Sequence, residues 1–220
     1  MRSVKNTQQI TKAMKMVSAA KLRRAQSAVQ QMRPYSDKLD QMLRNILSNL
    51  EGDAETTFGQ ERPVENACIV IVTSDRGLCG AFNTNVSKAA VGIMERKYAQ
   101  VRANGQLTIL PIGKKGYDFF RKRYPDLNYR KDFINLFEDL SFDNVARASQ
   151  YLMDAFENKE FDAIDVAYGH FRNAVMQTPS AVQWLPVAKL EKEEDDKQRA
   201  YYLFEPNKED LLEYLVPSIL

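Results

Sequence analysis

The chain has 220 residues, of which 44% are hydrophobic and 27% are charged, a composition typical of a soluble globular protein with a real core. It contains no apolar run near the roughly 20 residues of a membrane-spanning helix, no apolar block typical of a secretory signal, and too few cysteines and histidines for a zinc site or a disulfide framework. The net charge of +2 hides an asymmetry, because residues 1–36 hold eight of the 31 basic residues and no acidic one, so the remainder is acidic.

Residues 1–50 have the periodicity of one long helix. Three early apolar residues, Ile10, Met14 and Val17, alternate three and four apart, and a second set continues the spacing with an offset of one residue. Pro34 predicts a kink or, at most, a break. Such a seam is typical of a coiled coil, so this segment needs a partner helix. The second set is Leu22, Ala25, Val29, Met32, Ser36, Leu39, Leu43, Ile46 and Leu50.

The basic residues of this helix are the strongest local signal. They share the helix with Met14 and Met16, whose thioethers make adaptable apolar contacts. A cationic arm of this kind can bind nucleic acid, anionic lipid or an acidic protein surface, whereas a merely solvated face usually mixes signs. A nucleic-acid binder needs interleaved aromatic residues, and none precedes Tyr35, so an acidic protein surface fits better. The candidate cations are Lys12, Lys15, Lys21, Arg23 and Arg24.

After a polar loop at residues 51–66, expected to tolerate changes in length, strands and helices alternate. The continuous apolar run of residues 67–73 predicts a strand buried on both faces. Because the last strands lack helical crossovers, residues 67–205 are predicted to form an α/β domain with a mixed, Rossmann-like sheet. The further expected strands are 107–112, 163–168, 182–187 and 201–204, and the expected helices are 85–103, 115–124 and 143–158, the last capped by Ser141 or Asp143.

Residues 206–220 begin a second apolar helical pattern, which follows an acidic stretch at residues 191–196 that we expect to be a solvated loop. A first helix of about 47 residues is roughly 70 Å long, whereas a domain of about 150 residues has a radius of gyration near 15 Å. The long helix must therefore overhang its domain. We expect a second long helix, beginning near Asp210, to cover the seam, and the chain to be a fragment.

The turn SDRGLCGAFN, from Ser74 to Asn83, follows a buried strand and precedes a helix, which is where doubly wound folds bind phosphate. Its glycines do not complete G-x-G-x-x-G, and it lacks the ending of a Walker loop. The segment Gly113–Gly116 is equally incomplete. Two tight turns that need glycine dihedrals are the simpler interpretation, and a nucleotide-binding α/β domain remains the alternative.

Cys79 lies next to Arg76 and to a helix start, a setting that can activate a thiolate. The sequence offers it no general base, because the single histidine, His170, follows a different strand. No pair of carboxylates is marked out as acid and base. We therefore expect no catalytic residue, no metal and no cofactor.

Several segments resemble the gamma subunit of the F-type ATP synthase. Residues 2–26 closely resemble the first helix of that family, and the turn from Ser74 to Asn83 resembles its internal motif, with Ala81 where glycine is commoner. The later matches are YGHFRNA from Tyr168, QWLP from Gln183, and YLFEP from Tyr202 with Leu211 and Leu212. By this resemblance the chain lacks about a dozen residues before Met1 and the final helix after Leu220.

The resemblance implies a central-stalk rotor that is not catalytic by itself. In the family, two long helices form a coiled coil inside a ring of alpha and beta subunits, and rotation driven by protons or sodium cycles the catalytic beta subunits. The α/β domain couples this shaft to the epsilon subunit and the membrane c ring. The resemblance implies that the chain is peripheral, at the cytoplasmic face of the bacterial inner membrane. It implies no direct insertion into the membrane and no nucleic-acid partner.

Carried over position by position, the resemblance assigns two groups of partner-binding residues. Arg76 and Cys79 fall on a turn that faces a loop of a beta subunit. The first-helix group faces an acidic lever segment of the beta subunits, and consists of Lys12, Met14, Lys15, Lys21, Arg23 and Arg24.

Overall fold

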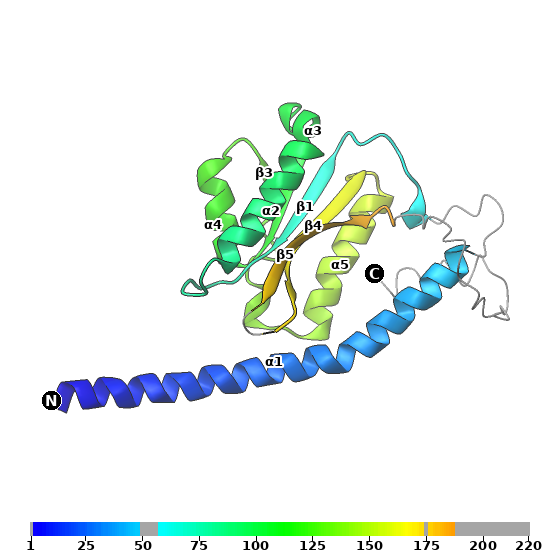
Figure 1. Cartoon of the computed structure of the whole chain (residues 1–220). Helices are drawn as coiled ribbons and strands as arrows, with labels where there is room; N and C mark the ends of the chain where they lie inside the picture. Colours follow the sequence, from blue (N-terminus) through cyan, green and yellow to red (C-terminus); the bar gives the residue numbers. More distant parts are fainter. Residues whose placement is uncertain (1, 49–56, 174–175, 188–220) are drawn as a thin grey trace. The chain divides into compact units, whose positions relative to one another are not determined.

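The computed structural model of the chain describes residues 2–48, 57–173 and 176–187 (Figure 1). The chain divides into two compact units, of which one contains the long helix α1 and the other contains the remaining described elements. Three predicted features lie outside the described residues: the strand at 201–204, the acidic stretch at 191–196 and the helical pattern at 206–220.

Helix α1 runs without a break over Arg2–Ser48, a length of 47 residues, as Figure 1 shows. Pro34 lies inside it, so the predicted long helix is confirmed and the proline does not end it. The segment contains no glycine and is rich in Ala, Met, Lys, Gln and Arg, all good helix formers. Along the seam, Leu22 exposes 43% and Met32 67% of their surface, and an apolar stripe this open is typical of a helix that packs against another helix.

The second unit is built on a five-stranded sheet of order β3-β2-β1-β4-β5. β1 pairs in parallel with β2 and β4, β3 pairs in parallel with β2, and β5 pairs antiparallel with β4. The predicted mixed, Rossmann-like sheet is therefore confirmed. The strands are β1 (Ala67–Val72), β2 (Leu107–Ile112), β3 (Asn128–Tyr129), β4 (Ala163–Phe171) and β5 (Gln177–Leu185).

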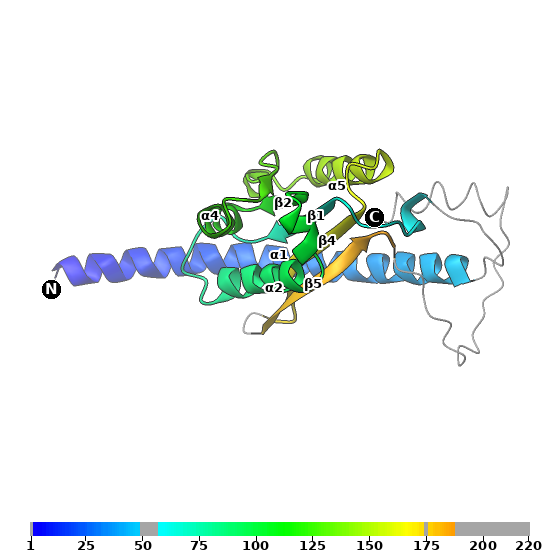
Figure 2. The same cartoon turned by 90° about the horizontal axis from the view of Figure 1, so that it is seen from above.

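Helices cover both faces of this sheet, and Figure 2 shows α2 and α5 on opposite sides of it. The expected helix at 85–103 is instead two helices, with a break at Lys97 and Tyr98. These two residues turn their polar groups toward Asp165 on β4. Lys97 Nζ lies 3.0 Å from the Asp165 carboxylate, and the buried Tyr98 hydroxyl donates to the same group. The helices are α2 (Phe82–Arg96), α3 (Ala99–Ala103), α4 (Lys114–Arg123) and α5 (Phe142–Glu157), with short 3-10 turns η1 (Thr57–Gly59) and η2 (Leu136–Glu138).

One core lies between the sheet and α2 to α4, where Ile69 and Ile71 of β1 pack with Met94 and Phe120. On the α5 side, Phe58 of η1 is buried and stacks on Phe156, with 6.3 Å between ring centroids. The expected polar loop at residues 51–66 thus contains a buried aromatic residue, and its tolerance to changes in length stays a prediction. The described part, from residue 57, is held to α5 by the contact between Phe58 and Phe156, which could not be predicted from the sequence of the loop.

Candidate functional site

Six of the eight candidate partner-binding residues lie on α1, and their side chains are exposed to solvent. Met14 exposes 66% of its surface, unusually much for an apolar side chain. None of the five candidate cations on α1 makes an ion pair with a carboxylate in the described part of the chain. The helix therefore presents uncompensated positive charge together with an adaptable apolar side chain.

The cations are distributed around α1. Because successive residues of an α-helix are rotated by about 100°, Ile10, Met14 and Val17 share one side of the helix. Lys12 and Arg23 lie on the side opposite these three residues, whereas Lys21 and Arg24 point to the same side as they do, at a level where the apolar seam has shifted to Leu22 and Ala25. The charge thus surrounds the helix, which contrasts with the single cationic face of a typical nucleic-acid-binding helix.

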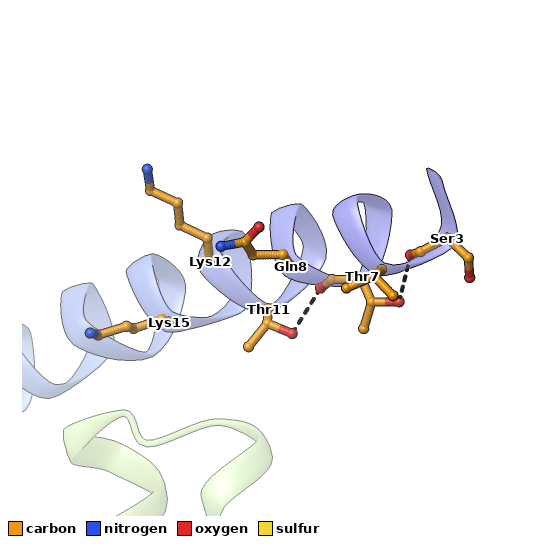
Figure 3. Close-up of a pocket in the computed structure, with 7 residues that line it drawn as sticks. Ser3, Thr7, Gln8, Thr11, Lys12 and Lys15 are labelled. Atoms are coloured by element: carbon orange, nitrogen blue, oxygen red, sulfur yellow. Dashed lines mark hydrogen bonds between the residues drawn. The ribbon is translucent and has the colours of Figure 1, made fainter. Parts of the chain in front are cut away.

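Figure 3 shows the first turns of α1, where polar and cationic side chains line an open hollow along the helix. Thr7 Oγ1 donates to the Ser3 carbonyl at 3.0 Å, and Thr11 Oγ1 donates to the Thr7 carbonyl at 2.9 Å. These hydroxyls are satisfied by the helix itself. The polar groups that remain for a partner in this hollow include Lys12 and Lys15.

The other two candidates lie in the turn between β1 and α2, which Asn83 organises from the first turn of the helix. Its Oδ1 accepts from the Ser74 backbone N–H at 2.9 Å, and its Nδ2 donates to the Ser74 hydroxyl at 2.9 Å and to Cys79 Sγ at 3.1 Å. The Ser74 hydroxyl in turn donates to the Arg76 carbonyl at 2.5 Å. The turn is therefore held by one amide side chain, and it brings Arg76 and Cys79 together.

The tip of this turn is shaped for contact. Leu78 adopts a φ of 62°, uncommon for a residue with a side chain, and Gly80 adopts 60°. The Leu78 side chain is fully exposed, and Arg76 and Cys79 are exposed beside it. An apolar and a cationic side chain at the tip of a structured turn are typical of a protein contact surface.

The structure argues against a nucleotide site at the second glycine segment, because the start of α4 is already occupied. Its first three backbone N–H groups donate to the Asp75 carboxylate at 3.0 Å, the Ser74 carbonyl at 3.1 Å and the Thr73 hydroxyl at 2.7 Å. A Cβ on Gly113, whose φ is 99°, would lie 2.1 Å from the Thr73 carbonyl oxygen. This glycine allows close backbone approach, as the simpler interpretation predicts, and the N–H groups that would cradle a phosphate are taken.

The two cysteines differ in environment. Cys68 is fully buried in β1, and burial raises the pKa of its thiol well above the usual range. Cys79 is exposed, and His170 is also exposed but lies on β4, far along the chain. Within residues 2–48, 57–173 and 176–187, no group of three His, Cys, Asp or Glu side chains is arranged to hold a metal ion.

The sequence predicted the positions of the candidates but not what holds them. It identified the turn by its glycines, whereas the organising role of Asn83 depends on the folded geometry of the turn. Leu78, which is fully exposed, was not singled out from the sequence. Its position between Gly77 and Gly80 in a turn is a signal that could have identified it. None of the helices that the structure describes has the length and apolar content needed to cross a membrane.

Comparison with known proteins places these features in one family. The family model described as ATP synthase matches residues 1–220. The ATP synthase gamma chain of Cytophaga hutchinsonii is 42% identical over 220 residues, which cover 99% of this chain and 74% of the relative. The gamma chain of Flavobacterium psychrophilum is 42% identical over 218 residues, covering 99% of this chain and 73% of the relative.

Two solved structures share the fold. The central stalk and c-ring structure of the Tetrahymena thermophila mitochondrial ATP synthase matches with a TM-score of 0.59 at 21% identity, covering 96% of this chain and 89% of that chain. The rotor of the Euglena gracilis mitochondrial ATP synthase matches with a TM-score of 0.53 at 26% identity, covering 84% of this chain and 59% of that chain.

Proposed function

The chain belongs to the ATP synthase gamma-chain family, and we propose that it couples ion-driven rotation of the membrane c ring to conformational cycling of the catalytic beta subunits. In this role it is a non-catalytic part of the central stalk. Its partners are the alpha and beta subunits of the catalytic head, the epsilon subunit and the c ring, and within this complex the chain lies peripherally at the cytoplasmic face of a bacterial inner membrane. The ion is a proton or sodium.

The observation that carries this proposal is the distribution of charge around α1. A shaft inside a ring of subunits meets partners on every side that its second helix leaves open, so the cations of α1 should point in more than one direction. Lys12 and Arg23 point to one side of α1 and Lys21 and Arg24 to another, and all four lie outside the seam of Leu22, Ala25 and Val29, which matches that requirement. Exposed pairs contribute roughly 0–1 kcal/mol each and are screened beyond about 8 Å at physiological salt. Many weak, exchangeable contacts suit a rotating bearing better than one strong pair.

The apolar side of α1 has a separate role. Leu22 and Met32, which leave much of their surface exposed, repeat at the spacing of a coiled-coil seam. We infer that a second, antiparallel helix of the gamma subunit packs on this side. Residues 1–50 then form one half of the shaft, residues 51–66 a connection, residues 67–205 the α/β domain, and residues 206–220 the start of the second helix.

The turn between β1 and α2 supplies a second contact with the head. Arg76 provides the charge and Leu78 provides an apolar tip, while Asn83 fixes the turn from α2. We propose that this turn meets a loop of a beta subunit. Cys79 acts there as a hydrogen-bonded structural residue, because its sulfur accepts from Asn83 at 3.1 Å and the turn offers it no histidine.

The two alternative functions receive less support. A nucleotide-binding domain needs free N–H groups at a helix start, and those of α4 are bonded to Asp75, Ser74 and Thr73. A nucleic-acid-binding helix needs its cations on one face with aromatic side chains between them, and α1 carries no aromatic residue before Tyr35.

The proposal is tested by assembly. A gamma subunit with this sequence is mixed with alpha and beta subunits, purified through a tag on beta, and assayed for ATP hydrolysis. We expect a complex with all three subunits and hydrolysis that the chain alone lacks. Absence of the chain from the purified complex, or hydrolysis by the chain in a preparation free of beta, would sink the proposal.

A further inference from the structure

A second concentration of positive charge lies in the α/β unit, around α4 and the segment after β3. Residues 114–131 contain seven basic and two acidic residues. Lys114 pairs with Glu138 at 3.1 Å, and Arg130 pairs with Glu160 at 2.5 Å. The other five have no carboxylate partner in the described part of the chain, and they are Lys115, Arg121, Lys122, Arg123 and Lys131.

Helix electrostatics explain only some of these charges. The last turn of α4 contains Arg121, Lys122 and Arg123, and cations there interact favourably with the carbonyl end of the helix dipole. Arg123 also stacks over the ring of Phe119 at 4.4 Å. Lys131 belongs to the segment after β3, however, and the dipole of α4 does not explain why this lysine lies near Tyr117 of α4.

Two exposed cations from different segments approach the half-buried ring of Tyr117. The Arg121 guanidinium lies 5.5 Å and the Lys131 ammonium 5.7 Å from the centre of the Tyr117 ring. Desolvation raises the pKa of the Tyr117 phenol, but the nearby positive groups of Lys131 and Arg121 outweigh it, so the net pKa lies below its ordinary value. The phenol therefore sits in a positive potential.

The aromatic member of this cluster is held in place. Tyr117 packs edge to face on Tyr129, with ring centroids 5.9 Å apart and an angle of 85°. Tyr129 is itself fixed, because its hydroxyl donates to the Tyr124 carbonyl at 2.6 Å. The Tyr117 hydroxyl is thus presented at a defined position, with a cation from α4 and a cation from the following segment beside it.

We propose that Tyr117, Arg121 and Lys131 form a binding site for a phosphate group. A guanidinium offers two parallel N–H donors, an ammonium adds a point charge, and a phenol adds an O–H donor, which together match the oxygens of a phosphate. The phosphate belongs either to a free nucleotide or to the headgroup of an anionic phospholipid. Because the site is open to solvent, its affinity for one phosphate is weak, roughly millimolar.

The experiment compares two variants of the chain that lose the same charge. Arg121→Gln with Lys131→Gln removes the site, and Lys88→Gln with Arg96→Gln removes two exposed cations of α2 that lie outside it. Each protein is titrated with ATP, and separately sedimented with vesicles of phosphatidylcholine with and without phosphatidylglycerol. The backbone N–H signal of residue 121, which every variant keeps, is followed by NMR, because the cations of α1 add non-specific binding.

We expect the backbone N–H signal of residue 121 in the wild-type chain and in the α2 variant to shift with at least one phosphate ligand, and Tyr117→Phe to weaken that response about threefold. The Arg121 and Lys131 variant should lose about tenfold in affinity for the same ligand. A response to ATP alone identifies a free nucleotide, and a response to phosphatidylglycerol vesicles alone identifies a lipid headgroup. Equal losses in both double variants, or no shift with any ligand, would overturn the proposal.

Discussion

Replacing Asp162 with alanine tests how the connection before β1 is held to the α/β unit. One carboxylate oxygen accepts from Arg62 Nε at 2.6 Å, and the other accepts from the backbone N–H groups of Glu65 and Asn66 at 3.0 and 2.9 Å. Both partners of the ion pair are largely buried, with side-chain exposures of 17% for Arg62 and 10% for Asp162.

The expected loss in the free energy of unfolding is about 3 kcal/mol. Removing one member of a buried ion pair costs roughly 3–5 kcal/mol. The lower end applies, because Arg62 keeps two carbonyl acceptors and stays 4.3 Å from the centre of the Phe156 ring. Asp162→Asn should lose about half as much, since the amide oxygen can still accept one of the backbone N–H groups.

Urea unfolding measures this loss through the fluorescence of Trp184, the single tryptophan, which lies in β5. The control is Asp126→Ala, which removes an ion pair with Arg102 whose side chains expose 31% and 49% of their surface. That variant should lose at most about 1 kcal/mol. Equal losses for the two alanine variants would refute the idea that burial makes the Asp162 pair important.

Three further predictions concern single positions. Gly113→Ala should cost more than about 2 kcal/mol in urea unfolding, because a Cβ there would lie 2.1 Å from a carbonyl oxygen, whereas Gly105→Ala, at a φ of 74° with open space, should cost only about 1 kcal/mol. A thiol reagent should modify only Cys79 in the native chain, and both Cys79 and Cys68 after denaturation. Rapid modification of both thiols in the native chain would contradict the burial of Cys68. Burial raises the pKa of Tyr151 to about 12, so the unfolded chain loses this proton first and stability falls between roughly pH 10 and 12, a fall that Tyr151→Phe should reduce in unfolding measured across that range. An unchanged alkaline profile in that variant would count against it.

The parts of the fold that could be predicted are those whose signal is local. The long helix follows from its periodicity and the absence of glycine, and β1 follows from a continuous apolar run that suits a strand buried on both faces. The break after α2 could not be predicted, because Tyr98 leaves the helix to reach Asp165, far away in the sequence. β3 is only two residues long and is defined by its pairing with β2.

The candidate site divides in the same way. The cations of α1 and the glycine-bearing turn are visible in the sequence, because they depend on residue type and spacing. The role of Asn83 and the exposure of Leu78 depend on the path of the turn. The approach of both Lys131 and Arg121 to the Tyr117 ring depends on the fold that brings two segments together.

The central claim is that the charge around α1 transmits rotation. The most direct test changes Lys12, Lys15, Lys21, Arg23 and Arg24 together to Glu in the gamma subunit of a reconstituted ATP synthase, and measures ion pumping against ATP hydrolysis. Single Lys→Ala changes should alter coupled turnover only slightly, because each exposed pair contributes roughly 0–1 kcal/mol. Changing all five residues to Glu should impair assembly or lower the amount of ion pumping per ATP hydrolysed. Circular dichroism should show that the α/β unit is still folded. Normal assembly with an unchanged pumping ratio would contradict the account and leave these cations as a solvated face.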